Sequence, residues 1–391
     1  MQLSSDDLPM FFTDAHRALA ARLRVAAPTL AAVEALPGDE AARDAAAVTA
    51  LAAAGLFAHV APEGGAVDSR ALCLCRELLG YVSARADSIF AVQGLGGHPI
   101  LLAGSPAQRA ELPRLAAGER VAAFALTEPG AGSDVAAIAT AARRVDDGYV
   151  LDGDKLFISN LGVAHVATVF AQVRGDEAPP GRALTAFWVP LDAPGVTVTP
   201  QTAIAPHPIG ALALRGVHLP ASARIGAPGE GFALAMKTLD AFRVSVGAAA
   251  VGMARRALDE AAAHVIGRVQ FGKPLAEQPL VAAHLADCAV DLDAARLLVL
   301  RAAYQKDHGA GRAASAAVSI AKLGATEAAS RVIDRAVQLL GGRGVMAGAV
   351  VEHLYRAIRP LRIYEGTSEI QRTLIGKAVV AAASAAAKEP T

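Results

Sequence analysis

The hydrophobic pattern of this chain changes character twice, and that order limits the folds it can adopt. From about residue 6 to 118, Ala-, Leu- and Arg-rich segments indicate helices, which proline and glycine are expected to break at Pro28 and across 94–99. Short, often β-branched runs over 121–199 indicate strands, and long helical stretches return after residue 231. Because strands and helices do not alternate, the sequence excludes a doubly wound sheet of the kind that binds NAD.

We therefore predict a multi-domain protein with α and β parts, since 391 residues also exceed what one hydrophobic core usually organises. The N-terminal helical domain is expected at 1–119, a middle β domain of barrel or sandwich type at 120–225, and a C-terminal helical bundle at 226–391. The dipeptides Asp147-Gly148 and Asp152-Gly153 predict hairpin turns within the β domain.

The charges of the chain are balanced, with 37 basic and 37 acidic residues, so no net field attracts nucleic acid or an anionic membrane. Hydrophobic residues reach 53%, but much of this is alanine, and no window approaches the roughly 18 uninterrupted apolar residues of a spanning helix. The cysteines, Cys73, Cys75 and Cys288, lack metal-ligand spacing. We predict a cytoplasmic protein with no metal site, no nucleic-acid partner and no membrane segment.

A loop that follows a predicted strand carries the first chemical signal. The segment 125–134 reads Ala-Leu-Thr-Glu-Pro-Gly-Ala-Gly-Ser-Asp, which gathers two glycines and the hydroxyls of Thr127 and Ser133. Glycine removes the Cβ obstacle, so such a loop can approach the edge of a flat polar cofactor closely. Composition alone would favour an ordinary turn.

This segment resembles the first signature of the acyl-CoA dehydrogenase family, and a second region near Gln338 is similar to another family motif. The resemblance extends over nearly the whole chain, to Lys377. It implies a helical domain, a β domain and a four-helix C-terminal domain, with FAD as cofactor and an acyl-CoA as substrate. It also implies a homotetramer or homodimer with FAD contacts across subunits, and an electron-transferring flavoprotein as electron acceptor.

The resemblance implies which residues hold FAD. Phe157 would pack against the flavin ring, with Ser159 near its reactive nitrogen. Arg268 would reach the pyrophosphate bound in a neighbouring subunit, because a guanidinium binds phosphate oxygens through two donors and keeps its charge. The full set implied is Phe124, Leu126, Thr127, Gly132, Ser133, Phe157, Ile158, Ser159, Arg268, Phe271, Gln278, Gln338, Gly341, Gly342, Thr367 and Glu369.

The same resemblance identifies Glu365 as the base that starts the reaction. It lies in Tyr-Glu-Gly-Thr at 364–367, the usual family motif, whereas a minority of the family places the base just before the position of Arg243. That position is Phe242 here, which cannot accept a proton. A partly apolar site can raise the pKa of a glutamate to roughly 6 to 7, a range that suits proton abstraction beside a thioester. The implied substrate-binding residues are Ser133, Asp240, Arg243 and Gly366.

Three departures from the family pattern limit what can be transferred. The segment 201–213, with Pro206-His207-Pro208, replaces the usual basic linker, so contacts of that linker cannot be carried over. Pro279 stands where a cofactor-binding glutamine often lies and leaves Gln278 one place early. Ala357 replaces the aspartate of a common Arg-Asp pair.

The same motifs are compatible with more than one function. The predicted reaction is α,β-dehydrogenation of an acyl-CoA to the trans-2-enoyl-CoA. A flavoenzyme of the same fold with different chemistry, such as an acyl-CoA oxidase, desulfinase or monooxygenase relative, is the alternative, because fold does not fix function. A flavin-free helical scaffold is disfavoured by the joint presence of Thr127, Ser133, Arg268, Gln338 and Glu365.

Overall fold

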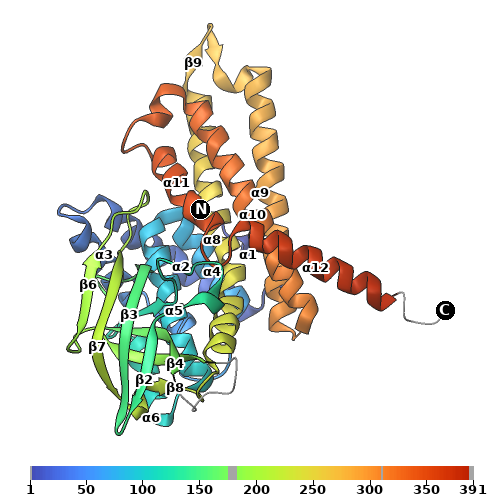
Figure 1. The fold of residues 1–391 in the computed structure, drawn as a ribbon. Helices are drawn as coiled ribbons and strands as arrows, with labels where there is room; N and C mark the ends of the chain where they lie inside the picture. The colour runs from blue at the N-terminus through green and yellow to red at the C-terminus, as the bar shows by residue number, and fades with distance from the viewer. Residues whose placement is uncertain (1, 175–182, 310, 387–391) are drawn as a thin grey trace. The chain divides into compact units, whose positions relative to one another are not determined.

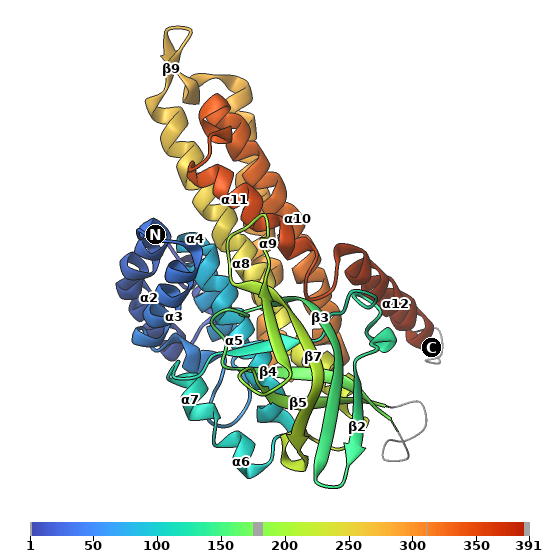
Figure 2. The ribbon, with the colours of Figure 1, turned by 60° about the vertical axis from the view of Figure 1, so that its left-hand side comes forward.

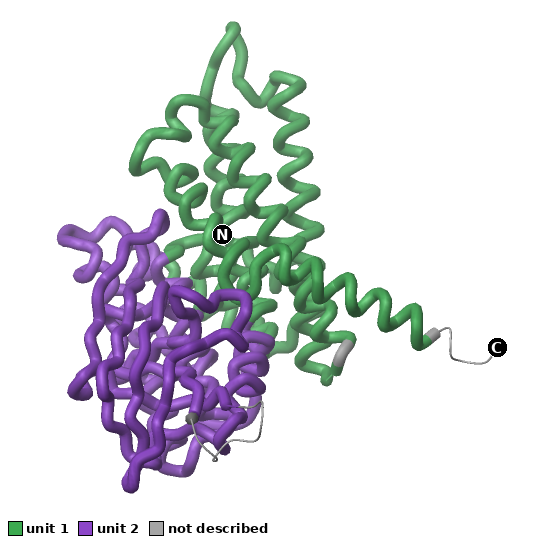
Figure 3. Tube along the Cα trace, viewed as in Figure 1, with its two compact units in different colours: residues 1–27, 68–84, 243–391 green, residues 28–67, 85–242 purple. Residues whose placement is uncertain are grey.

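A computed structural model describes residues 2–174, 183–309 and 311–386 of the chain. The chain folds into two compact units (Figure 3): unit 1 comprises residues 1–27, 68–84 and 243–391, and unit 2 comprises 28–67 and 85–242. Along the sequence, helices precede a β region and further helices follow it (Figure 1). The predicted helical, β, helical order is confirmed.

The N-terminal region is helical, but two predicted helix breaks are wrong. Pro28 lies inside a helix, and a single helix runs through the glycines and proline of 94–99. A Cβ on Gly94 would lie 2.3 Å from the ring of Phe242, and one on Gly96 would lie 2.7 Å from Ala122. Close packing therefore uses these glycines and overrides their low helix propensity. The helices are α1 (Ser4–Asp7), α2 (Asp14–Ala32), α3 (Glu40–Ala53), α4 (Ser69–Val82), α5 (Ala84–Ala103), α6 (Pro106–Arg109) and α7 (Leu112–Ala116).

The middle region forms one mixed eight-stranded sheet within unit 2, in the order β6-β7-β3-β2-β4-β5-β8, with β1 beside β4. Strand β4 pairs with three other strands of this sheet. Strands β1 and β2 pair with β4 in parallel, one after the other along its length, and β5 pairs with it antiparallel. The strands are β1 (Ala122–Ala125), β2 (Ala141–Val145), β3 (Gly148–Ser159), β4 (Val166–Arg174), β5 (Leu184–Pro190), β6 (Val196–Pro200), β7 (Ile209–Pro220) and β8 (Arg224–Ile225).

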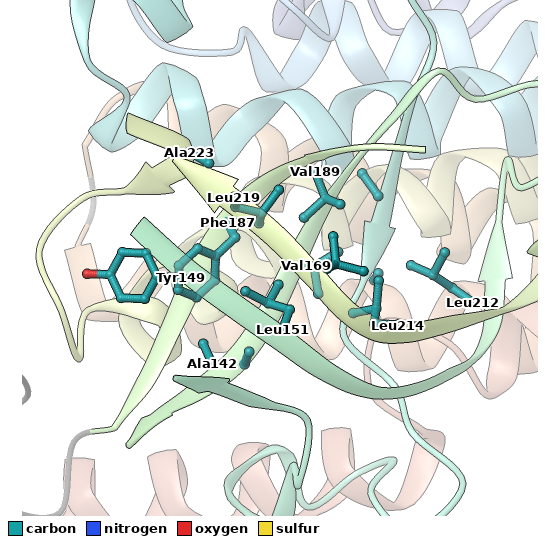
Figure 4. Close-up of a cluster of buried hydrophobic side chains, with 14 of the residues drawn as sticks. Ala142, Tyr149, Leu151, Val169, Phe187, Val189, Leu212, Leu214, Leu219 and Ala223 are labelled. Carbon is teal, nitrogen blue, oxygen red and sulfur yellow. The ribbon is translucent and has the colours of Figure 1, made fainter. Parts of the chain in front are cut away.

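Both faces of β4 are buried, which explains its nearly continuous hydrophobic sequence. Ala167, Val169, Ala171 and Val173 join a cluster between the strands (Figure 4), in which Tyr149 and Phe187 meet edge to face with ring centroids 5.0 Å apart. The alternate residues Val166 and Phe170 join a second cluster with side chains of α5, α7 and the start of α8 (Gly231–Gly267). Alternation with period two therefore fixes the register of the sheet.

One of the two predicted hairpin turns is confirmed and the other is wrong. Strands β2 and β3 form an antiparallel pair that closes at Val145 and Gly148, as Asp147-Gly148 predicted. Asp152-Gly153 instead lies inside β3, at a register shift in its pairing with β7. A Cβ on Gly153 would lie 2.5 Å from the hydroxyl of Thr140, so this glycine permits a bulge with close approach instead of a turn.

The C-terminal helices are long, and α10 packs against α9, α11 and α12 (Figures 1 and 2). Small residues permit close packing, since a Cβ on Gly247 of α8 would lie 2.7 Å from Val299 of α9. None of the described helices is both long and apolar enough to cross a lipid bilayer. The elements are α8 (Gly231–Gly267), β9 (Val269–Gln270), β10 (Lys273–Pro274), α9 (Pro279–Asp307), α10 (Gly311–Leu340), α11 (Val350–Ile358) and α12 (Ser368–Ala386).

Candidate active site

The predicted base, Glu365, lies in a tight turn just before α12 in unit 1. Its backbone φ is 52°, and that of Gly366 is 92°, so two consecutive residues adopt left-handed conformations. Such a conformation is uncommon for a residue with a side chain and persists only where neighbouring groups hold it.

Three side chains hold this turn through its carbonyl oxygens. Arg243 Nε donates to the carbonyl oxygen of Glu365 at 2.9 Å, and Lys322 Nζ donates to that of Gly366 at 2.8 Å. Gln371 Nε2 donates to both oxygens, at 3.4 and 3.1 Å. Lys322 and Gln371 are fully buried. We call these three side chains the carbonyl clamp.

The clamp also fixes the direction of a backbone donor. All described peptide bonds are trans, so the N–H of Gly366 points opposite to the carbonyl of Glu365 in the same peptide plane. Because Arg243 and Gln371 hold that carbonyl, the amide of Gly366 is directed away from them. The turn therefore presents an amide of fixed direction at the residue that follows Glu365, which suits an oxygen that gains negative charge.

Lys322 brings a positive charge close to the turn. Desolvation lowers the pKa of Lys322 to about 8, while the field of Glu365 raises it and the field of Arg243 lowers it further.

We expect Lys322→Met to destabilise the protein more at pH 10 than at pH 7, by about 2 kcal/mol, since one pKa unit corresponds to about 1.4 kcal/mol. The pKa of Lys322 is lower when folded, so the unfolded chain binds its proton more strongly between pH 8 and 10.5. The contribution of Lys322 to stability therefore rises with pH across that window. Denaturant unfolding at both pH values measures it. Lys377→Met, on the exposed side of α12, is the control and should show no such difference.

The start of α12 is anchored separately. Glu327 of α10 accepts hydrogen bonds from Ser368 Oγ at 2.6 Å and from Arg362 Nε at 3.0 Å. Thr367 Oγ1 accepts from the backbone N–H of Ile370 at 3.3 Å, and Glu369 is exposed. Thr367 thus helps begin the helix that follows Glu365.

In unit 2, a buried ion pair supports the Gly-rich loop. Lys155 Nζ lies 2.8 Å from Glu128 Oε1 and donates to the carbonyl of Leu126 at 3.2 Å. Glu128 also accepts from Thr140 and from the N–H of Ala139. Burial lowers the pKa of Lys155 to about 8, with Glu128 opposing that shift. This buried ion pair therefore connects the Gly-rich loop to strand β3.

Strand β3 presents three predicted cofactor residues in different ways. The ring of Phe157 is 61% exposed, and its φ is 57°, again in the left-handed region. Its backbone N–H donates to Gln201 Oε1 at 3.3 Å. Ile158 points into the sheet core, and Ser159 Oγ lies 3.3 Å from Nε2 of His207. An exposed aromatic ring at a strained position is a feature to expect where a planar ligand binds.

The remaining predicted residues of unit 2 differ in exposure. Gly132 and Ser133 are exposed, and a Cβ on Gly132 would meet nothing within 4 Å. Leu126 is buried, and Thr127 is partly exposed. Phe124 packs edge to face on Phe170, with ring centroids 5.0 Å apart.

The segment before Arg243 on α8 is also part of unit 2. Asp240 is partly exposed, whereas Phe242 is fully buried against His98.

A third group of predicted residues lies at one end of the helical bundle of unit 1 (Figures 1 and 2). Arg268 follows α8, Phe271 is 95% exposed in the β9–β10 turn, and Gln278 precedes α9. Gln338 is exposed near the end of α10, followed by Gly341 and Gly342, around which a Cβ would meet nothing within 4 Å.

The bundle end carries positive charge. The pKa of His264 is lowered by desolvation, then by the fields of Arg343 and Arg268, which places both cations near one side chain. Two arginines beside an open glycine turn suit a pyrophosphate.

Each unit, taken by itself, carries residues that suit one part of a flavin dinucleotide. The exposed Phe157 ring and the open Gly132–Ser133 loop suit a flat ring with polar edges, and the arginines at the bundle end suit phosphates. In the described parts of the chain, no group of three or more His, Cys, Asp and Glu side chains is placed to hold a metal ion.

Lys322, Gln371, Lys155 and His207 were missed by sequence reasoning. For Lys322 a signal exists, since Val318, Ala321 and Ala325 are buried residues of the same α10 face, where a lysine requires a partner. The partner itself, a backbone carbonyl 44 residues away, leaves no trace in the sequence.

Three family models match successive parts of this chain. They are the N-terminal, middle and C-terminal domain models of acyl-CoA dehydrogenase, and they match residues 13–119, 123–217 and 229–380.

Full-length relatives give the same result. The mitochondrial short-chain specific acyl-CoA dehydrogenase of Homo sapiens is 38% identical over 329 residues, covering 82% of this chain and 79% of the relative. The structure of butyryl-CoA dehydrogenase from Megasphaera elsdenii matches with a TM-score of 0.85 and 32% identity, over 94% of this chain and 99% of that one. A glutaryl-CoA dehydrogenase from Mycobacterium smegmatis in complex with FADH2 matches with a TM-score of 0.85 and 29% identity, over 96% and 97%.

Proposed function

The chain belongs to the acyl-CoA dehydrogenase family, and on that premise we propose that it oxidises an acyl-CoA thioester to the trans-2-enoyl-CoA with FAD as cofactor. The observation that carries the proposal is the clamped turn of Glu365 and Gly366. A carboxylate and an oriented amide on one rigid turn suit removal of a proton beside a carbonyl.

Glu365 takes the proton from the α-carbon in this proposal. The hydrogen bonds of the clamp end on backbone oxygens of the turn, so they fix the backbone that carries Glu365. The amide of Gly366 is aimed to donate to the thioester oxygen as that oxygen gains charge. Arg243, Asp240 and Ser133 are proposed to bind the CoA-bearing substrate.

The proposed FAD contacts come from three places: the Gly-rich loop, the end of strand β3 and the end of the helical bundle. Phe157 packs on the ring system, and Ser159 and Thr127 offer hydroxyls to its polar edge. Arg268, with Gly341 and Gly342, holds the phosphates and adenosine half of the FAD bound in a neighbouring subunit. When bound, the flavin supplies a two-electron acceptor for the hydride that leaves the β-carbon.

Several further assignments come from the family or from the sequence prediction, and single observations agree with two of them. We propose an electron-transferring flavoprotein as the electron acceptor and a homotetramer or homodimer as the assembly. The exposed Phe271 supports contacts beyond this chain. A cytoplasmic location agrees with three free cysteines that are all buried. The domain boundaries 1–119, 120–225 and 226–391 stay a prediction.

Anaerobic mixing of the purified, FAD-loaded protein with a panel of saturated acyl-CoAs tests the proposal. We expect at least one member, with a short, branched, alicyclic or aromatic acyl group, to bleach the flavin absorbance and to yield a product lighter by two hydrogens. Absence of bleaching across the panel would contradict the proposal. Rapid return of the flavin absorbance in air would favour an acyl-CoA oxidase of the same fold.

A further inference from the structure

The segment 201–208, part of the 201–213 stretch that is predicted to depart from the family pattern, packs against the end of strand β3 within unit 2. Asn160, which is fully buried, donates its backbone N–H to the carbonyl of Pro208 at 2.8 Å. Gln201 Oε1 accepts from the N–H of Phe157 at 3.3 Å. His207 lies between these two contacts in the sequence and reaches Ser159. The segment therefore braces the residues on both sides of Ser159.

The hydrogen bonds of His207 determine which of its ring nitrogens carries a proton. Nδ1 lies 3.0 Å from the carbonyl oxygen of Ala205, and a carbonyl only accepts, so Nδ1 must be the donor. Desolvation and the field of Arg85 lower the pKa of His207, with the Ala205 bond opposing, which favours the neutral ring. In the neutral ring with Nδ1 protonated, Nε2 is an acceptor.

The direction of the Ser159 hydroxyl follows from this tautomer. Ser159 Oγ lies 3.3 Å from Nε2, so its single proton is donated to the histidine. What the oxygen then offers to a ligand is its lone pairs. A serine without such a partner could turn its proton toward the ligand instead.

We propose that His207 is a positioning residue that makes Ser159 a hydrogen-bond acceptor toward the flavin ring. This inference rests on the proposed function, because it places the flavin beside Phe157 and Ser159. A flavin ring gains N–H donors when it is reduced, so an acceptor at Ser159 stabilises the reduced form over the oxidised form. His207 thereby raises the reduction potential of the bound cofactor.

Two substitutions at His207 separate this role from simple packing. Asparagine keeps an N–H near the position of Nδ1 for the Ala205 carbonyl but offers nothing at the position of Nε2. Glutamine reaches the position of Nε2 with a carbonyl oxygen that can still accept from Ser159.

We expect His207→Asn to weaken binding of reduced FAD relative to oxidised FAD by up to about tenfold, the size of one hydrogen bond. For a two-electron couple this is about 30 mV toward more negative potential. His207→Gln should remain close to the parent.

The measurement is the midpoint potential of bound FAD, followed by absorbance without any acyl-CoA. In a Ser159→Ala background, which itself should shift the potential in the negative direction, His207→Asn should have no further effect. If His207→Asn binds FAD with the parent's potential, or shifts it equally without the Ser159 hydroxyl, the inference is wrong. If the His207→Asn variant does not fold, an unchanged potential in Ser159→Ala alone overturns it. A parent protein that binds no FAD would overturn the proposed function together with this inference. A parent that binds FAD but whose potential the substitutions leave unchanged would overturn this inference alone.

Discussion

Replacing Glu365 with glutamine is expected to lower turnover by about 10²- to 10⁴-fold, the range that general-base catalysis contributes. Glutamine keeps the shape of the side chain but cannot accept the α-proton. The clamp bonds of Arg243, Lys322 and Gln371 end on backbone oxygens, so they survive the substitution. FAD content should therefore match the parent, which assigns the loss to chemistry, whereas thermal stability is expected to fall slightly because the buried Lys322 loses the field of Glu365.

A matched control is Glu352→Gln on α11 of the same unit, where the carboxylate pairs with Arg356 at i, i+4. Such a surface pair contributes at most about 1 kcal/mol to stability, and we expect parental turnover. Steady-state rates with the best acyl-CoA of the panel compare the three proteins. Glu365→Gln turnover within threefold of the parent would remove the proposed base from the mechanism.

Lys155→Met should cause the largest loss of stability, of about 3–5 kcal/mol, because it removes one partner of a buried ion pair. Glu128 would keep a charge that is only 6% exposed and now lacks its cation. The carbonyl of Leu126 would lose a donor at the same time. Since the Gly-rich loop begins there, we also expect weaker retention of FAD, measured by flavin absorbance after gel filtration.

The double variant Lys155→Met with Glu128→Gln tests the cause. Removing the unpaired charge should restore part of the lost stability, because the neutral glutamine side chain can still accept from Thr140. Lys237→Met, at an exposed position in unit 2, should leave the unfolding temperature unchanged. If the double variant is no more stable than Lys155→Met, the ion pair is not what supports the loop.

Local sequence signals sufficed for the order of helices and strands. The β-branched runs around β4 and the turn at Asp147-Gly148 carry their structure in their own residues. Sequence signals gave wrong predictions where the local structure depends on residues distant in the sequence. The glycines of 94–99 predict a break in isolation, yet they lie in a continuous helix in which Gly94 packs closely against Phe242.

The site shows the same division between local and distant information. Glu365 and Gly366 follow from a four-residue motif, whereas Lys322 and Gln371 are recognisable only once the chain has brought them to the carbonyls of the turn. The tautomer of His207 likewise depends on how the segment 201–208 folds back to β3. A hydrogen-bond partner that is remote in the sequence produces no periodic pattern from which it could be predicted.

The most direct test of Glu365 as the base is hydrogen exchange at the α-carbon. An acyl-CoA with sulfur in place of its β-carbon can lose its α-proton but has no hydride to give at that position. Incubated in D2O with this compound, the parent protein is predicted to incorporate deuterium at the α-carbon, detected by mass, and Glu365→Gln is predicted to incorporate none above the rate without enzyme. Equal exchange by both proteins would contradict the account.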